Sequence, residues 1–305
     1  MRKHFLKILN FSFFLCVGYG AVCQIGWVRK ANFPGTARDY DVGFSIGHYG
    51  FIGLGQNSGG GFLDDIYKWN QSTNTWSTIT NYPGTGRASP IAFTIEGKGY
   101  VGLGWTGSGG GTDFWRYDTT TNAWTSMATF PGPGRYDASW FVIGHKAYII
   151  SGSTGGPPYI GDVWVYDAHT NTWKQLNNSP AGQVDAAPAF AIGNRGYYVG
   201  GWSGSAMNTQ CYEYDTTNDS WTSIASIPNY EPGVSGNSRT WVVGSKGYVF
   251  NGWNAAEHTL NDGWVYDTVT KNWCEFTSMG KLERDFTAAF VINNKFYMGT
   301  GMDSW

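Results

Sequence analysis

The chain has 305 residues, a formal net charge of −2 and a sequence pI of about 6.2, so it carries no basic field that could neutralise a nucleic-acid backbone. Glycine contributes 44 residues, aromatic residues make up 17% of the chain and charged residues only 14%. This composition excludes a protein built mainly from amphipathic helices and favours many short strands separated by tight turns. We therefore expect one all-β domain rather than two ordinary domains.

The N-terminal segment has the layout of a secretory leader. Basic residues at Arg2, Lys3 and Lys7 precede an apolar run, and small residues follow it. The run is short for a membrane span, and two glycines interrupt it. We therefore predict a signal peptide over residues 1–23 and a mature chain without a membrane span, located in the periplasm, at the cell surface or outside the cell.

A tryptophan recurs along the chain with a period near fifty residues. Successive members of the series are 49, 48, 49, 48 and 52 residues apart, and an aromatic residue stands seven positions before each of the last five. The polar segment between the two aromatic residues favours a turn, so each pair predicts two strands joined by a hairpin. A fixed period of this length is typical of a propeller. The series comprises Trp27, Trp76, Trp124, Trp173, Trp221 and Trp273.

A second hairpin precedes each of these outer hairpins, as in the segments FVIGHKAYIISG and WVVGSKGYVFNG. Its two apolar runs are nearly continuous, which is expected for inner strands covered on both faces, whereas outer segments such as WRYDTTTNAW alternate more. Four strands per period form one blade. Several blades must then stack around a channel, because a single four-stranded sheet cannot bury both of its faces.

The chain resembles the kelch-repeat β-propeller family in three features that agree in register: a second strand ending in glycine, an aromatic residue in the third strand and the tryptophan of the fourth. The resemblance covers residues 24–305 and implies an all-β propeller of four-stranded blades. We expect six blades, with seven as the alternative. The family includes adaptor domains, sugar oxidases and sugar mutarotases, so function has to be argued from the site. The predicted repeats are 38–76, 88–124, 136–173, 184–221, 234–273 and a partial repeat, 284–305.

The partial last repeat contains only its first two strands. The segment around Trp27 resembles a lone fourth strand, which in this family usually closes the ring beside the final blade. We therefore predict an incomplete last blade with a gap one strand wide, roughly 5 Å, at the seam. The indole of Trp27 should be buried as those of Trp76 and Trp124 are in their own blades.

Two of the four cysteines fall in the predicted leader, which leaves Cys211 and Cys274 in a compartment that permits disulfides. The two residues lie in neighbouring repeats, so a single bridge is one interpretation. Two separate buried thiols are the interpretation that we favour, because two cysteines do not make a disulfide scaffold.

Binding residues are expected on the face that carries the longer loops, those from second to third strands and from blade to blade, which we call the mouth face. Four of six repeats place an arginine ahead of the first strand, and Val184 and Ser235 interrupt the series. Each arginine either contacts a ligand or pairs with an acid to fix the blade interface. The arginines are Arg38, Arg87, Arg135 and Arg284, and the acids beside them are Asp39, Asp41, Asp137, Asp185 and Asp285.

The residue after the second-strand glycine is a tryptophan in three repeats, at Trp105, Trp202 and Trp253. A flat indole face beside Asn, Asp and Arg suits a sugar, whose C–H face stacks while its hydroxyls form hydrogen bonds. Packing of these indoles on adjacent blades is the alternative interpretation.

Two enzyme classes of the family can be compared with the sequence. A copper oxidase needs two imidazoles and two tyrosines that converge, whereas His48, His145 and His169 are predicted in turns of the opposite face. A sugar mutarotase needs only an acid or base carboxylate and an arginine for an anionic sugar; here its residues would be Glu231, Glu257 and His258. Aspartates at the start of the third strand indicate a structural turn rather than calcium, at Asp65, Asp113, Asp162 and Asp262.

The function that we expect is a monomeric extracytoplasmic binding module for a carbohydrate or an extracellular protein, with no cofactor and no metal. The sugar mutarotase is the alternative, and a purely structural surface repeat is a third interpretation. The candidate ligand-binding residues are Arg38, Arg87, Arg135, Arg284, Trp105, Trp202, Trp253, Asp137 and Asp185.

Overall fold

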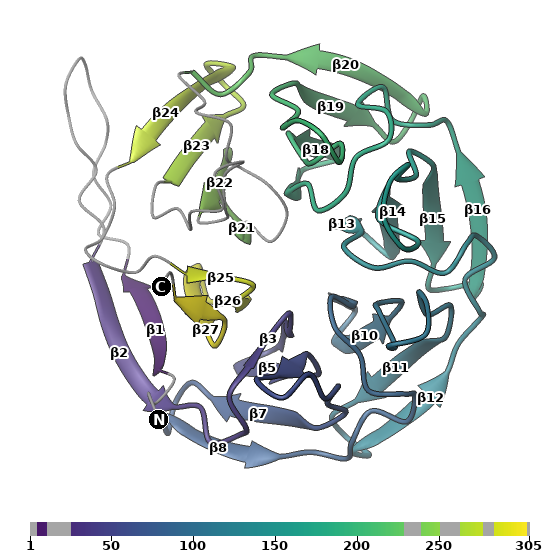
Figure 1. The fold of residues 1–305 in the computed structure, drawn as a ribbon. Helices are drawn as coiled ribbons and strands as arrows, with labels where there is room; N and C mark the ends of the chain where they lie inside the picture. The colour runs from purple at the N-terminus through teal and green to yellow at the C-terminus, as the bar shows by residue number, and fades with distance from the viewer. Residues whose placement is uncertain (1–4, 11–25, 229–238, 251–262, 277–283, 304–305) are drawn as a thin grey trace.

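The computed structural model describes residues 5–10, 26–228, 239–250, 263–276 and 284–303. These residues form antiparallel four-stranded sheets arranged as a ring (Figure 1). Within them no helix is long and apolar enough to cross a membrane. The all-β propeller of four-stranded blades predicted from the repeat is therefore confirmed.

Five blades are each built from four consecutive long strands, with the first strand innermost and the fourth on the rim (Figure 1). The first blade consists of β4 (Val42–Ile46), β5 (Tyr49–Gly53), β7 (Ile66–Asn70) and β8 (Thr75–Thr78), and the second of β9 (Ile91–Ile95), β10 (Lys98–Gly102), β11 (Phe114–Asp118) and β12 (Ala123–Ser126). The third blade consists of β13 (Ser139–Ile143), β14 (Lys146–Ile150), β15 (Val163–Asp167) and β16 (Thr172–Leu176), and the fourth of β17 (Ala189–Ile192), β18 (Arg195–Val199), β19 (Cys211–Asp215) and β20 (Ser220–Ile224). The fifth blade consists of β21 (Arg239–Val243), β22 (Lys246–Phe250), β23 (Gly263–Asp267) and β24 (Asn272–Phe276).

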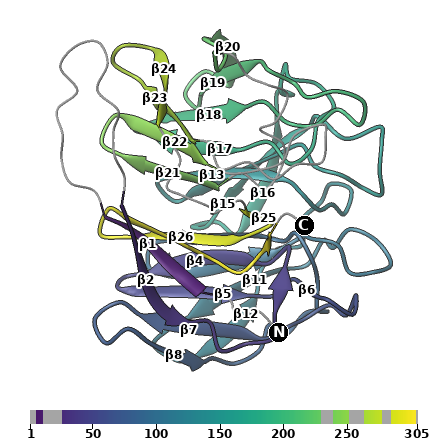
Figure 2. The same ribbon diagram turned by 60° about the vertical axis from the view of Figure 1, so that its left-hand side comes forward.

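The two ends of the chain form a further four-stranded sheet, which we call the closing sheet (Figures 1 and 2). Its strand order is β2-β1-β27-β26, so the two N-terminal strands lie side by side and meet the two C-terminal strands where β1 pairs with β27. The expected count of six or seven blades is thereby corrected to five blades of consecutive strands. The strands of the closing sheet are β1 (Phe5–Asn10), β2 (Gly26–Asn32), β26 (Ala288–Ile292) and β27 (Lys295–Gly299).

The predicted gap at the seam is not found, because β1 takes the place of the third strand. It pairs with β2 through five residue pairs and with β27 through Lys7↔Met298 and Ile8↔Tyr297. The segment 5–10 lies inside the predicted leader, so the repeat pattern, which begins at residue 24, did not predict a strand there. The predicted burial of the Trp27 indole falls outside the described side chains.

Short strand pairs at the mouth face connect the inner strands to the loops. They are β3 (Arg38–Asp39) with β6 (Gln56–Asn57), and β25 (Arg284–Asp285) with β28 (Met302–Asp303).

Tight turns follow from the residues that the hairpins place at them. Between β9 and β10 the two-residue loop Glu96-Gly97 has φ values of +49° and +73°, the conformation of a type I′ turn that matches the twist of the flanking strands. In the outer hairpin β11–β12, Asn122 is left-handed and its side-chain oxygen accepts the Tyr117 hydroxyl at 2.7 Å. In the first four blades the aromatic residue seven positions before the rim tryptophan thus stabilises its own turn.

Neighbouring blades interlock where a first-strand phenylalanine meets a second-strand glycine. A Cβ atom at Gly99 would lie 2.4 Å from a ring carbon of Phe44, so only glycine leaves room for the ring. The same contact joins Phe290 of β26 to Gly50 of β5, at 2.1 Å. The closing sheet therefore packs on the first blade as the blades pack on one another.

The rim tryptophans tie each blade to the preceding one. The indole N–H of Trp124 donates to the carbonyl of Thr80, and that of Trp173 donates to Ala128, at 3.0 and 2.9 Å. Trp76 donates in the same way to Ala31 in β2, at 3.2 Å. This hydrogen bond places β2 where the repeat predicts it, as the fourth strand ahead of the first blade.

Removal of β1 should open the closing sheet. A chain of residues 25–305 loses the hydrogen bonds of β1 to both neighbours, each with a net contribution of about 1 kcal/mol. We expect a loss of about 2 kcal/mol, or roughly 4–8 °C in the thermal unfolding midpoint, measured by circular dichroism. A chain lacking only residues 1–4 keeps β1 and is the control. Equal midpoints for residues 1–305 and 25–305 would show that β1 does not stabilise the ring.

Candidate functional site

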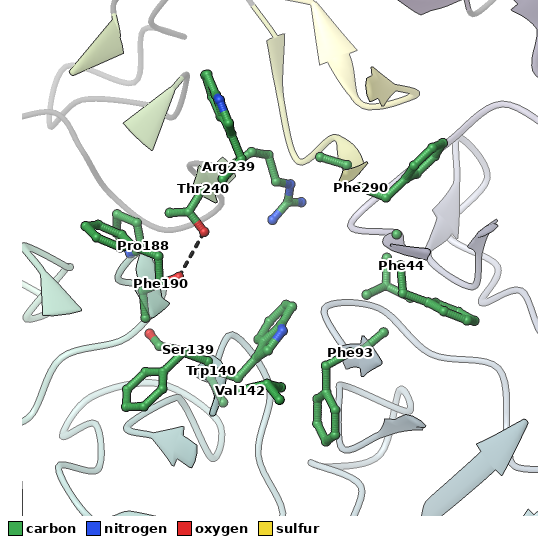
Figure 3. A pocket seen from close by; sticks show the side chains of 18 of the residues that line it. Phe44, Phe93, Ser139, Trp140, Val142, Pro188, Phe190, Arg239, Thr240 and Phe290 are labelled. Carbon is green, nitrogen blue, oxygen red and sulfur yellow. Dashed lines mark hydrogen bonds between the residues drawn. The ribbon is translucent and has the colours of Figure 1, made fainter. Parts of the chain in front are cut away.

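The first strands of the blades surround a cavity of about 360 Å³ in the central channel. All five blades line it, together with β26 of the closing sheet. Figure 3 shows the guanidinium group of Arg239 and the indole ring of Trp140 extending into it from opposite sides. The cavity is therefore open to both a charged and an aromatic contact.

Trp140 and Arg239 stand at positions where the other blades have smaller, uncharged side chains. Trp140 pairs with Ile149 in its blade, and the residues at the same register elsewhere are Gly43, Ala92, Ala189, Thr240 and Ala289. Arg239 pairs with Phe250, and its counterparts are Val42, Ile91, Ser139 and Ala288. The repeat thus leaves space in the channel, and two blades fill it with functional groups.

Asp41 lies at the mouth end of this cavity and is almost completely buried, with 3% of its surface exposed. Its Oδ1 accepts the Thr300 hydroxyl at 2.9 Å, whereas its buried Oδ2 has no hydrogen-bond partner. Burial raises the pKa of Asp41 to about 8, although the Thr300 hydrogen bond and the charges of Arg38 and Arg239 oppose the rise. This carboxyl group is therefore largely protonated at neutral pH.

Asp137 lines the cavity from the loop before β13. Its φ of +50° is a left-handed conformation, which aspartate tolerates better than most side chains and which turns the chain into the inner strand. Burial raises the pKa of Asp137 to about 6, against a hydrogen bond from Ser89 and the charge of Arg239. Its Oδ1 is buried without a hydrogen-bond partner.

Asp185 is the third acid of this group and is 8% exposed. Burial and the nearby charge of Asp137 raise the pKa of Asp185 to about 8. Its backbone forms a two-way bridge with Trp202, with N–H to O distances of 2.9 and 3.0 Å. We call Asp41, Asp137 and Asp185 the mouth acids.

Three of the predicted ligand-binding arginines lie inside the blades. Arg38, Arg87 and Arg135 have side chains that are 0 or 1% exposed, and each forms a double hydrogen bond with the aspartate at the start of the third strand. The pairs are Arg38–Asp65, Arg87–Asp113 and Arg135–Asp162, with a shortest distance of 2.5–2.6 Å in each. We call them the Arg–Asp clamps.

The clamp saturates the guanidinium group. In the third blade, Arg135 also donates to the carbonyls of Ser151 and Pro133, and its guanidinium stands over the Phe130 ring at 4.7 Å. Burial works against ionisation of Asp162, but the hydrogen bonds and charge of Arg135 outweigh it and the pKa of Asp162 is lowered. These contacts show a structural role for the arginines and for their aspartates. Ligand binding by them would require the clamp to open.

The interruptions of the series differ in kind. Val184 is buried, 2% exposed, and takes its place in an apolar cluster with no clamp. Arg284 begins β25 and pairs through its backbone with Asp303, but its side chain lies outside the described part of the chain. Ser235 falls in the segment 229–238, which is not described.

The predicted tryptophans lie at the mouth face and are half-buried. The indole of Trp105 meets the Tyr136 ring edge-on at 5.3 Å, and Trp202 donates a side-chain hydrogen bond to Tyr159. The Tyr159 hydroxyl also feels the charges of Asp185 and Asp137, which together with burial raise its pKa to about 12. Trp105, Trp202, Asp137 and Asp185 therefore belong to one aromatic and acidic region, whereas Trp253 lies outside the described residues.

The predicted mutarotase residues Glu231, Glu257 and His258 all lie outside the described residues. Across the described segments no group of three or more His, Cys, Asp and Glu side chains is placed to hold a metal ion. The imidazoles of His145 and His169 stack at 4.0 Å on the opposite face, beside Glu96. Both later cysteines are free; Cys211 is buried as predicted, but Cys274 is exposed.

Sequence analysis did not identify Arg239, Trp140 or Tyr159. The signal for the first two was present, because a charged and a large aromatic residue stand at registers that other repeats fill with smaller side chains. Tyr159 lies in the loop after the second strand of its blade. The length of this loop varies between repeats, so aligning the repeats does not predict the contact of Tyr159 with Trp202.

Breaking a clamp should cost far more than breaking a surface ion pair. Arg135→Met leaves the half-buried Asp162 carboxylate without its partner, and we expect a loss of about 3–5 kcal/mol in urea unfolding. Arg135→Met combined with Asp162→Asn should lose less, because no uncompensated charge remains. The control is Lys98→Met, which breaks the partly exposed pair with Asp118 and should cost much less than Arg135→Met, because solvent screens this pair. Equal losses for Arg135→Met and Lys98→Met would contradict the clamp.

The mouth acids should destabilise the fold as pH rises. Because the pKa of Asp41 is raised from 3.8 to about 8, the folded state binds a proton that the unfolded chain releases, and this stabilisation is lost between pH 4 and pH 8. We expect the stability of Asp41→Asn relative to the wild type to rise by about 4 kcal/mol from pH 5 to pH 8, at about 1.4 kcal/mol per pH unit. Urea unfolding at both pH values measures it. Asp118→Asn, whose carboxyl has a lowered pKa, should show no such gain.

Comparison with known proteins agrees with this architecture. The family model described as the KLHDC2/KLHL20/DRC7 Kelch-repeats domain matches residues 42–190 and 129–301. A search of the curated proteins finds no match. The two family matches together span all five blades and the C-terminal half of the closing sheet, and the chain therefore belongs to the KLHDC2/KLHL20/DRC7 Kelch-repeats domain family.

Proposed function

We propose that the chain is an extracytoplasmic binding module that holds a carbohydrate or an extracellular protein at the mouth face, as a monomer. Kelch propellers are in general protein-binding modules. The location rests on the leader-like segment 1–23, and cleavage after that segment would remove β1 from the closing sheet. The choice of face rests on the cavity and the region around it. The observation that carries the proposal is the convergence of Trp105, Trp202 and the mouth acids beside a channel cavity of about 360 Å³.

The side chains around the mouth acids favour ligand binding over catalysis. The half-buried indoles of Trp105 and Trp202 offer flat apolar faces, and carboxyl groups stand next to them. A sugar ring or a side chain of a partner protein can stack on such a face while its polar groups form hydrogen bonds at the edge. Because the clamp arginines are already saturated, the polar contacts to the ligand come from the mouth acids and from Arg239.

Truncation of the tryptophans tests the proposed face. The variant Trp105→Ala/Trp202→Ala/Trp253→Ala should lose retention on arrays of polysaccharides and extracellular proteins by at least tenfold in apparent affinity, about 1.4 kcal/mol. The double variant Trp105→Ala/Trp202→Ala should show most of this loss.

Val269→Ala is the matched control, since Val269 is 76% exposed in a turn between third and fourth strands, on the opposite face. Circular dichroism checks that each variant keeps the wild-type fold. Unchanged retention of the folded triple variant would rule out these tryptophans as the binding surface.

A further inference from the structure

The mouth acids are short of positive charge. Asp41 and Asp137 line the cavity, Asp185 lies near Asp137, and few charged groups among the described residues act on these three carboxyl groups. Arg239 acts on Asp41 and Asp137, and Arg38 acts on Asp41 while its guanidinium is held by Asp65. Among the described residues no cation acts on Asp185, and the neighbouring charge that does act on it is the like charge of Asp137.

Two carboxyl oxygens of the mouth acids also lack hydrogen-bond partners. Asp41 Oδ2 and Asp137 Oδ1 are buried, have no partner and belong to side chains that line the cavity. A buried carboxyl oxygen without a hydrogen-bond partner costs about 1–3 kcal/mol, whether it is an ionised acceptor or carries the proton, and such groups are rare in folded proteins. Asp41 is 3% exposed, so bulk water does not compensate for it. Something that donates hydrogen bonds into the cavity would relieve both oxygens.

Aromatic groups adjoin the acids on the mouth face. Tyr159 lies close enough to Asp137, Asp185 and Tyr136 to interact with them electrostatically. Trp202 contacts Tyr159, and Trp105 contacts Tyr136. Electron-rich ring faces attract cations, an effect that strengthens where water is excluded. Carboxylates and aromatic rings together favour a positively charged group over a neutral or negative one.

We propose that the mouth end of the cavity is a recognition site for a primary ammonium group, held by Asp41 and Asp137 as carboxylates and bordered by the aromatic residues. An ammonium has three donors and no acceptor, which fits two carboxylates with unpartnered oxygens. The inference rests on the proposed function, because it names the chemistry of a ligand bound at that face. An amino sugar and a lysine side chain of a partner protein both supply this group.

Binding of the ammonium displaces protons from the site. Ionised Asp41 and Asp137 bind the cation, whereas their protonated forms do not, so ligand and proton compete. Because these two carboxyl groups have pKa values of about 8 and about 6, the affinity should rise as pH increases from 6 to 8. The rise should be about tenfold per pH unit for each proton displaced. The other polar groups that act on the pair are Arg38, Arg239, Thr300, Ser89 and Asp185. Asp185, whose pKa is about 8, becomes negatively charged as the pH rises through this range, which strengthens the effect.

The experiment is calorimetric titration of the intact chain with paired probes. Nα-acetyl-L-lysinamide carries the ammonium group and Nα,Nε-diacetyl-L-lysinamide lacks its charge; D-glucosamine and N-acetyl-D-glucosamine form the corresponding sugar pair at pH 7. We expect the charged member of at least one pair to bind at least tenfold more tightly than its neutral partner. The pair that shows the difference identifies the source of the ammonium.

Two further measurements keep the test independent of any single variant. Asp41→Asn and Asp137→Asn should each weaken binding of the charged probe at least tenfold, whereas Glu96→Gln, which removes a carboxylate from the opposite face, should not change it. In the wild type, the affinity for Nα-acetyl-L-lysinamide should rise between pH 6 and pH 8 and binding should release protons into the buffer.

Equal affinity for charged and neutral probes, absence of binding by both charged probes, or an affinity independent of pH would each overturn the proposal. Failure here is distinguishable from failure of the mouth face as a binding surface. If the tryptophan variants still abolish retention on the arrays while the ammonium probes do not bind, the face is correct and the ligand chemistry is wrong.

Discussion

Each Arg–Asp clamp joins the segment that enters a blade to the strand that leaves its inner hairpin. The guanidinium of Arg87 binds both oxygens of Asp113, and the carbonyl of the same arginine accepts the N–H of Gly55 in the preceding blade at 2.7 Å. One residue therefore fixes the geometry within a blade and the contact between two blades. Since a guanidinium buried without its carboxylate would be strongly destabilising, the clamp also limits where the chain can run. The left-handed residues that follow, Ser89 after Arg87 and Asp137 after Arg135, are aimed into the channel by this framework.

The proposed binding site consists of residues at which one blade differs from the others. Most first strands present small or aliphatic side chains to the channel, and the cavity exists because these side chains do not fill it. Trp140, Arg239 and the mouth acids break the symmetry of the repeat in different blades and at different registers, and they meet only because the ring closes. The acids remain in or near the cavity although burial raises the pKa of each, which indicates that they are kept for a reason other than stability.

The sequence was sufficient for the repeat because its signals are local. The spacing of Trp76 and Trp69, the turn residues between them and the glycine of the second strand all act within one blade, and each was predicted with its correct register. The closing sheet was not predictable in the same way, since β1 pairs with β27 across almost the whole chain and the segment 5–10 also satisfies the pattern of a leader. The arginine series was predicted as a set, with pairing to acids as one of two interpretations. Its partners were less obvious, because Asp113 stands 26 residues beyond Arg87. The mouth acids share no register, so no periodic pattern could bring Asp41, Asp137 and Asp185 together.

The closing sheet has a consequence for how the chain can reach this structure. During synthesis the five blades can form in order as they leave the ribosome, because their contacts are local or between neighbours. The contact of Phe290 with Gly50 and the pairing of β27 with β1 cannot form until residues 288–299 have emerged. Until then the first and fifth blades expose faces that the finished ring buries. A second nascent chain offers the same two faces, so at high local concentration on a polysome the joining of two open rings competes with the closure of one.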